Sequence, residues 1–162
     1  MILTPEEREL LAVQAATEYP FESCGVILAR DGARRLLACR NVQNELHARD
    51  PEGHPRDART AYYIDPADLL RIGRLEGEGF TVAVIYHSHV DTGAYFSETD
   101  RRNALLGGEP SYPDSTYVVT SVMSGRVDAM AAFRWDAARR DFLPVDDPSL
   151  AAGHEARVRS SR

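Results

Sequence analysis

Residues 80–86 (Phe-Thr-Val-Ala-Val-Ile-Tyr) form a nearly unbroken run of β-branched and aromatic side chains. A run of this kind, without alternating polar residues, is typical of a β-strand that is covered on both faces. Such a strand needs helices or another layer on each side, so it favours a layered α/β architecture. The chain has 162 residues, which is enough for one domain with its own hydrophobic core.

The other elements are predicted from capping residues, turns and apolar runs. Helices are expected over residues 5–18, 66–76 and 97–106, each with a capping Thr, Asp or Ser at its start. Strands are expected over residues 24–29, 34–39, 61–64, 116–122, 126–135 and 141–145. The sequence therefore predicts a mixed β-sheet flanked by helices.

Two segments are predicted to lie outside this regular structure. Residues 44–60 are polar and rich in Asp, Pro, Gly and Arg, a composition typical of a long loop. Beyond Pro148 the residues become small and charged, which is typical of a frayed terminus. We therefore expect a single domain over residues 1–148 and a flexible tail over residues 149–162.

Composition and charge argue against several classes of partner. The chain carries 19 basic and 25 acidic residues, a net charge of −6, whereas a general nucleic-acid binder normally has a basic excess. No apolar run approaches the length of a membrane-spanning helix, and the first residues lack the pattern of a secretory signal. The two cysteines, Cys24 and Cys39, are too few for a disulfide framework and are expected to be buried free thiols. We expect a cytoplasmic protein that binds neither nucleic acid nor a membrane.

Two histidines stand directly after the central apolar run. In an extended chain, side chains two residues apart point to the same side, so His87 and His89 face one way and Ser88 the other. Two convergent imidazoles at the end of a strand are suited to binding a zinc ion.

A third ligand is expected from the helix that begins at Ser97, eight residues after His89. The intervening loop allows the first turn of this helix to fold back toward the histidines, which brings Asp100 to the metal. Three protein ligands, His87, His89 and Asp100, would leave one position for water, as in catalytic zinc sites and unlike structural ones.

A catalytic zinc site also needs a base and a group that stabilises the developing oxyanion. Glu22 stands at the entrance of an apolar strand, where burial would raise the pKa of its carboxyl group and suit it to the first role. Ser97 is placed to donate a hydrogen bond to the oxyanion. We therefore predict Glu22 and Ser97 as the catalytic residues and Zn²⁺ as the cofactor.

In this order and spacing, the residues resemble the motif of the JAMM (MPN+) metallopeptidases, an upstream Glu followed by His-x-His-Pro-x6-Ser-x2-Asp. The chain has Glu22, then His87-Ser88-His89, six residues over 91–96, and Ser97-Glu98-Thr99-Asp100. It departs at Val90, where proline is commonest; because that proline is not a ligand, the departure concerns the path of the loop. The resemblance implies an MPN fold, similar to that of cytidine deaminases, and the same roles for ligands, acid/base residue and oxyanion donor.

Residues 85–89 (Ile-Tyr-His-Ser-His) and 94–97 (Ala-Tyr-Phe-Ser) are most similar to small prokaryotic members of the family, of the CysO-cysteine peptidase type. This resemblance implies hydrolysis of an amide or isopeptide bond after the C-terminal Gly-Gly of a ubiquitin-like or sulfur-carrier protein. An extended Gly-Gly tail suits a narrow cleft because it has no side chains. The predicted loop over residues 44–60 is expected to border the groove for this substrate.

Three other interpretations are open at this stage. Ser97 and Asp100 also form a common helix-capping pair, which needs no catalytic role. A non-catalytic MPN-type scaffold would bind protein partners only, although such members typically lack the metal ligands, and this chain has all of them. A zinc deaminase would need a Pro-Cys-x-x-Cys ligand pair, which the sequence lacks.

Overall fold

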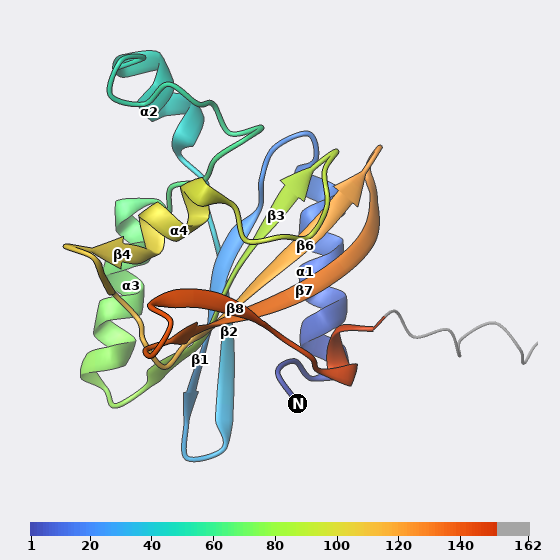
Figure 1. Ribbon diagram of the computed structural model, residues 1–162, viewed down its shortest axis with the longest axis vertical. Coiled ribbons are helices and arrows are strands. Elements are labelled where there is room, and N and C mark those ends of the chain that lie inside the picture. Colours follow the sequence, from blue (N-terminus) through green and yellow to red (C-terminus); the bar gives the residue numbers. More distant parts are fainter. Residues whose placement is uncertain (152–162) are drawn as a thin grey trace, which may run out of the picture.

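The central apolar run lies in β3 (Thr81–Val90), in the middle of a six-stranded sheet in the computed structural model, which describes residues 1–151 (Figure 1). The strand order is β2-β1-β3-β6-β7-β8, with β3 and β6 parallel and the other neighbours antiparallel. The other strands of this sheet are β1 (Cys24–Arg30), β2 (Ala33–Cys39), β6 (Thr116–Met123), β7 (Arg126–Asp136) and β8 (Asp141–Val145). The prediction of a mixed sheet is confirmed.

Helices cover both faces of the sheet, as the continuous apolar run of β3 predicts. On one face, Leu11 of α1 (Pro5–Glu18) packs into a cluster with Val84 of β3. On the other face, Ile72 of α3 (Pro66–Gly77) and Ala104 of α4 (Glu98–Ala104) join a second cluster with Ile85. The predicted α/β fold class is thus confirmed. Within residues 1–151, none of the helices has the length and apolar character that crossing a bilayer requires; the cytoplasmic location stays a prediction.

A β-bulge in β3 decides which of its side chains face which layer. Ala83 is an extra residue, since Val82 and Val84 stand opposite adjacent residues of β1. Val82 therefore faces α3 and α4, whereas Val84 faces α1. From Val84 onward the strand alternates regularly, which directs His87 and His89 to the side of α3 and α4.

The segment predicted as a long loop contains a helix, α2 (Gln43–Arg49), so this part of the prediction was wrong. The helix begins without a side-chain cap. Gln43 Nε2 donates to the carbonyl oxygen of Arg56 at 2.8 Å, and Asn44 Oδ1 accepts from the backbone N–H of Ala58 at 2.8 Å. A short polar helix has little stability of its own, and the contacts that hold this one join residues far apart in the sequence.

Residues 61–64, predicted as a strand, form an isolated bridge between Asn41 and Ile64 instead. The side chain of Asn41 takes the place of a partner strand. Its Nδ2 donates to the carbonyl oxygen of Ala61 at 3.2 Å, and its Oδ1 accepts from the N–H of Tyr63 at 3.0 Å. Because a side chain satisfies these backbone groups, no regular strand pairing forms here.

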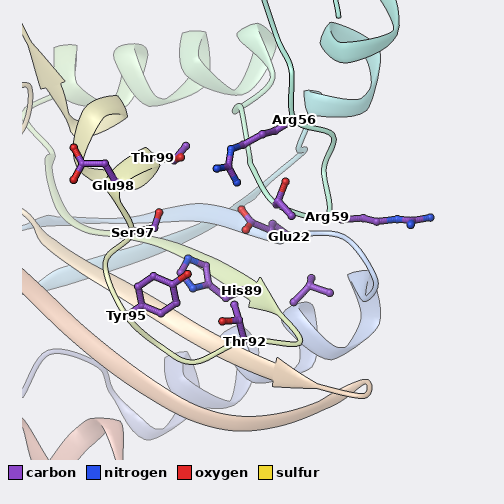
Figure 2. A pocket seen from close by; sticks show the side chains of 11 residues that line it. Glu22, Arg56, Arg59, His89, Thr92, Tyr95, Ser97, Glu98 and Thr99 are labelled. Atoms are coloured by element: carbon purple, nitrogen blue, oxygen red, sulfur yellow. The ribbon is translucent and has the colours of Figure 1, made fainter.

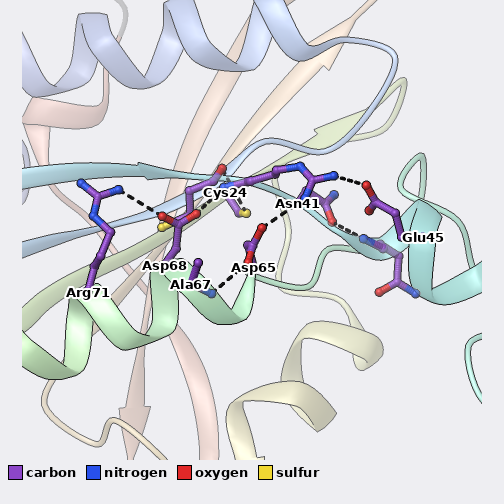
Figure 3. A network of polar contacts seen from close by, with 10 residues as sticks. Cys24, Asn41, Glu45, Asp65, Ala67, Asp68 and Arg71 are labelled. Carbon is purple, nitrogen blue, oxygen red and sulfur yellow. Dashed lines mark hydrogen bonds and ion pairs between the residues drawn. The ribbon is translucent and has the colours of Figure 1, made fainter.

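A polar network fastens the segment between β2 and α3 to the sheet (Figure 3). The backbone N–H of Arg40 donates to Asp68 at 2.9 Å, and its guanidinium donates to Asp65 at 3.1 Å. The same guanidinium pairs with Glu45 of α2, and Asp68 pairs with Arg71 at 3.1 Å. The network therefore joins the end of β2 to α2 and α3.

The third predicted helix ends at Ala104, earlier than expected. The next residues form a small hairpin of β4 (Leu105–Leu106) and β5 (Glu109–Pro110). Gly107 and Gly108 at its tip have φ values of 61° and 84°, which a two-residue hairpin turn requires and which glycine adopts most readily. The glycine pair thus makes a hairpin turn.

The two cysteines lie opposite each other on β1 and β2, and both are buried free thiols, as predicted. Burial raises the pKa of Cys39 to about 12 and raises that of Cys24 as well. Neither thiol is therefore suited to act as a thiolate nucleophile or ligand.

Residues at the two ends of the described chain pack together. The 3₁₀ helix η1 (Pro148–Leu150) places Leu150 in the cluster beneath α1, and Ser149 Oγ accepts from the N–H of Leu3 at 3.2 Å. Ser149 and Leu150 are the first residues of the segment predicted as a flexible tail. Most of that segment, residues 152–162, lies outside the described residues.

Glu7 joins the start of α1 to β2. Its carboxylate accepts the N–H of Thr4 at 2.9 Å, which completes a capping box, and accepts two hydrogen bonds from Arg34 at 2.6 Å and 2.9 Å. Arg34 also donates to the carbonyl oxygen of Ile2 at 3.0 Å. Burial opposes the charge of Glu7, but the contacts with Arg34 and Thr4 outweigh it and lower the pKa of this carboxyl.

Glu7→Gln should therefore destabilise the protein by roughly 1–3 kcal/mol at neutral pH, because a charge-assisted pair is lost. A lowered pKa contributes stability that is present above the ordinary value of 4.5 and lost as the pH falls below it. Denaturant unfolding at several pH values should show the two proteins converging under acid. Glu6→Gln, at the exposed neighbouring position, is the control; an equal loss there would contradict the assignment.

Candidate metal centre

Three side chains of metal-ligand type meet near the carboxyl end of β3. Nε2 of His87 and Nε2 of His89 are 3.2 Å apart. They lie 3.1 Å and 3.2 Å from the two carboxylate oxygens of Asp100. All three residues are buried. Because β3 extends through Val90, the histidines belong to the strand itself instead of following its end.

The position of the ring proton of His89 leaves a nitrogen lone pair that can bind a metal ion. Nδ1 of His89 lies 3.0 Å from the carbonyl oxygen of Gly93, which can only accept, so Nδ1 is the protonated nitrogen when the ring is neutral. Nε2 of His89 then presents a lone pair to the Asp100 carboxylate. Two acceptors at this distance repel unless a proton or a metal cation lies between them. Two imidazoles and a carboxylate are a ligand set that zinc accepts.

Two tyrosines contact the imidazole rings. Tyr62 stacks on His87 with ring centroids 4.6 Å apart and an interplanar angle of 24°, and Tyr95 meets His89 edge-on at 5.0 Å. Nδ1 of His87 is buried and has no hydrogen-bond partner among the described residues. On its Nδ1 side, the ring of His87 is therefore held by stacking on Tyr62, whereas the ring of His89 is held by the hydrogen bond to Gly93.

Asp100 serves the helix cap and the cluster at the same time. Ser97 Oγ accepts the N–H of Asp100 at 3.0 Å, and Asp100 Oδ2 accepts the N–H of Ser97 at 2.9 Å, which is a complete capping box for α4. The same carboxylate faces both histidines, so the capping role does not exclude a ligand role. Burial opposes its charge, but the contacts with His87, His89 and Ser97 hold the pKa of Asp100 well below its usual range.

Glu22 is positioned by the pairing of β1 with β3. The N–H of Ser23 donates to Ser88 Oγ at 2.7 Å, and the N–H of Ser88 donates to the carbonyl oxygen of Ser23 at 3.0 Å. Glu22 precedes Ser23 and the histidines flank Ser88, so these two bonds fix the glutamate relative to the cluster. The N–H of Glu22 also donates to the carbonyl oxygen of Ala58 at 2.7 Å.

The carboxyl group of Glu22 is suited to proton transfer. Burial raises its pKa to about 9, the negative charge of Asp100 adds to this, and Arg56 opposes it. Glu22 therefore keeps its proton at neutral pH when no cation is bound, whereas a nearby dication would favour the carboxylate. A group with both protonation states within reach near pH 7 can act as a general acid and base.

A cleft of about 300 Å³ opens at His89, one residue of the cluster (Figure 2). Glu22, His89 and Ser97 all line it, so both predicted catalytic residues share one accessible space with a predicted ligand. Ser97 accepts a bond from Asp100 through a lone pair, which leaves its hydroxyl proton free to donate. Arg56, Arg59 and Thr60, from the segment expected to border a substrate groove, line one wall.

Sequence reasoning did not find Tyr62, Gly93 and Arg56. Tyr62 lies in a stretch that is typical of a strand, and Gly93 contributes a backbone carbonyl, which has no residue-specific signal. Arg56 lies in the polar segment that was predicted as a loop. Tyr62 and Arg56 are placed by contacts between residues distant in the sequence, whereas Gly93 lies four residues from its partner His89.

Comparison with known proteins identifies the family. Residues 5–137 match the family model described as prokaryotic homologs of the JAB domain. The chain belongs to this family. The predicted resemblance to the JAMM/MPN proteins is thereby confirmed.

The relatives of this JAB-domain chain include proteins with named activities. It is 29% identical over 125 residues to the CysO-cysteine peptidase of Mycobacterium tuberculosis, covering 76% of this chain and 75% of that protein. It is 33% identical over 122 residues to the desampylase of Haloferax volcanii, covering 75% and 74%. The solution structure of protein DSY2949 from Desulfitobacterium hafniense matches with a TM-score of 0.61 and 19% identity over 88% of each chain, a likeness of fold alone.

The raised pKa of Glu22 predicts a pH-dependent stability. Such a group contributes stability that is fully present below the ordinary value of 4.5 and lost as the pH rises toward about 9. In chelator-treated protein, Glu22→Gln should therefore match the wild type near pH 5 and be more stable by roughly 2–4 kcal/mol near pH 8.

Thermal unfolding across this pH range measures the difference. Glu98→Gln, which changes an exposed glutamate lining the same cleft, is the control and should follow the wild type throughout. A Glu22→Gln curve parallel to the wild type would show that burial does not perturb this carboxyl.

Proposed function

We propose that this JAB-domain protein is a zinc-dependent hydrolase that cleaves an amide or isopeptide bond after the C-terminal Gly-Gly of a ubiquitin-like or sulfur-carrier protein. The observation that carries the proposal is the meeting of a two-histidine, one-carboxylate cluster with a buried glutamate and a serine at one cleft. The peptidase and desampylase relatives support this class of chemistry.

Each residue has a distinct role in the proposed reaction. His87, His89 and Asp100 hold the zinc ion, which when bound supplies a Lewis acid and lowers the pKa of water. The Glu22 carboxylate removes a proton from the attacking water and hands it to the leaving amine. The Ser97 hydroxyl donates a hydrogen bond to the oxyanion that develops on the scissile carbonyl.

The size of the cleft supports a substrate with little side-chain bulk. Its volume of about 300 Å³ is at the lower end of the usual range for ligand sites. Two consecutive glycines let a backbone approach buried groups closely. A ubiquitin-like or sulfur-carrier protein with a Gly-Gly end is therefore the proposed partner.

Variants of the cluster and of the base should separate metal binding from turnover. Glu22→Gln should keep stoichiometric zinc and lose roughly 10²–10⁴-fold in kcat, since proton transfer is lost. His87→Ala and Asp100→Ala should lose both zinc and activity. Elemental analysis measures the metal. Mass spectrometry measures cleavage of sulfur-carrier and ubiquitin-like proteins that carry cysteine, lysine or peptide adducts.

Two outcomes of this experiment would contradict the proposal. Full activity in Glu22→Gln would remove the assigned base. Sub-stoichiometric zinc after gentle purification, together with no cleavage of any adduct, would favour the non-catalytic MPN-type scaffold.

A further inference from the structure

We propose that Arg56 binds the free α-carboxylate of the leaving group. The enzyme would then prefer a single amino acid joined to Gly-Gly through its α-amine over a lysine side chain joined by an isopeptide bond. This inference rests on the proposed function and specifies the class of its substrate.

Arg56 lies on the side of the cleft from which the leaving amine departs. In the proposed reaction Glu22 hands its proton to that amine, and Arg56 is near enough for its charge to act on the Glu22 carboxyl. Figure 2 shows the guanidinium of Arg56 turned into the cleft, between Glu22 and Thr99. An α-carboxylate carbon is two bonds, of about 1.46 and 1.52 Å, from the amine nitrogen. The α-carboxylate of the leaving group must therefore bind close to Glu22.

The guanidinium of Arg56 is available to an anionic ligand. The ion pairs found within residues 1–151 do not involve it. Glu98, the other glutamate of the cleft, points away from it in Figure 2. A planar guanidinium matches the two oxygens of a carboxylate in a bidentate pair.

The backbone of Arg56 is held in a fixed relation to Glu22. Its carbonyl oxygen accepts from Gln43 Nε2 at 2.8 Å, and Gln43 is buried. Two residues on, the N–H of Ala58 donates to Asn44 Oδ1 at 2.8 Å, while its carbonyl oxygen accepts the N–H of Glu22 at 2.7 Å. The contacts that hold α2 thus also place Arg56 beside the base, as a site for one substrate group requires.

A purely electrostatic role of Arg56 makes a different prediction. If its charge only tuned Glu22, its removal would slow all substrates alike and shift the pH profile of each. If it also binds the carboxylate, its removal slows substrates that carry this group next to the leaving amine more than substrates that lack it. A lysine isopeptide has no carboxylate at that position.

The test uses a sulfur-carrier protein ending in Gly-Gly, extended in three ways. The first adduct is cysteine with a free carboxylate, the second is cysteine α-carboxamide, and the third is lysine joined through its side-chain amine. Zinc-loaded wild type should cleave the first with a kcat/KM roughly 10–100-fold above that for the second, as expected for one charge-assisted pair. Arg56→Gln should bring this ratio close to one, because any effect of the lost charge on Glu22 acts on both adducts alike and cancels in the ratio.

Arg59→Gln is the matched control. Arg59 comes from the same segment and lines the same cleft, but Figure 2 shows its side chain running away from Glu22 and His89. This variant removes an equal charge and should keep the carboxylate-to-carboxamide ratio of the wild type. Arg56→Lys should keep part of the preference, since a point charge replaces a bidentate donor.

The outcomes separate this inference from the proposed function. Equal cleavage of the carboxylate and carboxamide adducts by the wild type, or an equal loss on both in Arg56→Gln, would overturn the role of Arg56 and leave the hydrolase intact. Cleavage of none of the three adducts by zinc-loaded wild type would count against the proposed function, and the inference would fall with it.

Discussion

The hydrogen bonds between Ser23 and Ser88 are the contact on which the site depends. They continue the antiparallel pairing of β1 with β3 past Cys24 and His87. Ser23, which directly precedes β1, is thereby held beside Ser88, near the end of β3. Both serines are buried, so water does not compete for these bonds. Because Ser88 faces away from the imidazoles, its hydroxyl is free to bind the backbone while its neighbours His87 and His89 belong to the candidate metal centre.

The pKa values of two buried carboxyl groups in this site, Glu22 and Asp100, are shifted in opposite directions. Burial dominates at Glu22 and raises its pKa, whereas the contacts with His87, His89 and the side chain of Ser97 outweigh burial at Asp100 and lower its pKa. The negative charge of Asp100 adds to the shift at Glu22. Asp100 is thus kept charged, as a metal ligand would need to be, and Glu22 is kept able to exchange a proton.

The chain between β2 and α3 supports the site from the side opposite the sheet. It carries Tyr62, which stacks on His87, and Ala58, which accepts the N–H of Glu22. The side chain of Asn41 holds this segment through hydrogen bonds with the carbonyl oxygen of Ala61 and the N–H of Tyr63. A region without regular strands is therefore ordered by side-chain contacts to the backbone, and its residues Arg56, Arg59 and Thr60 form one wall of the cleft.

Local patterns in the sequence determined the helices at residues 5–18 and 66–76, the strands of the sheet, and the convergence of His87 with His89. These features follow from capping geometry and from the two-residue period of a strand, which involve near neighbours alone. The helix α2, the bulge at Ala83 and the contacts of Tyr62 and Gly93 were decided by the tertiary structure. The helix, the bulge and the contact of Tyr62 depend on hydrogen bonds or packing between residues far apart in the chain, whereas Gly93 lies four residues from His89 but contributes a backbone carbonyl, which no side-chain pattern marks.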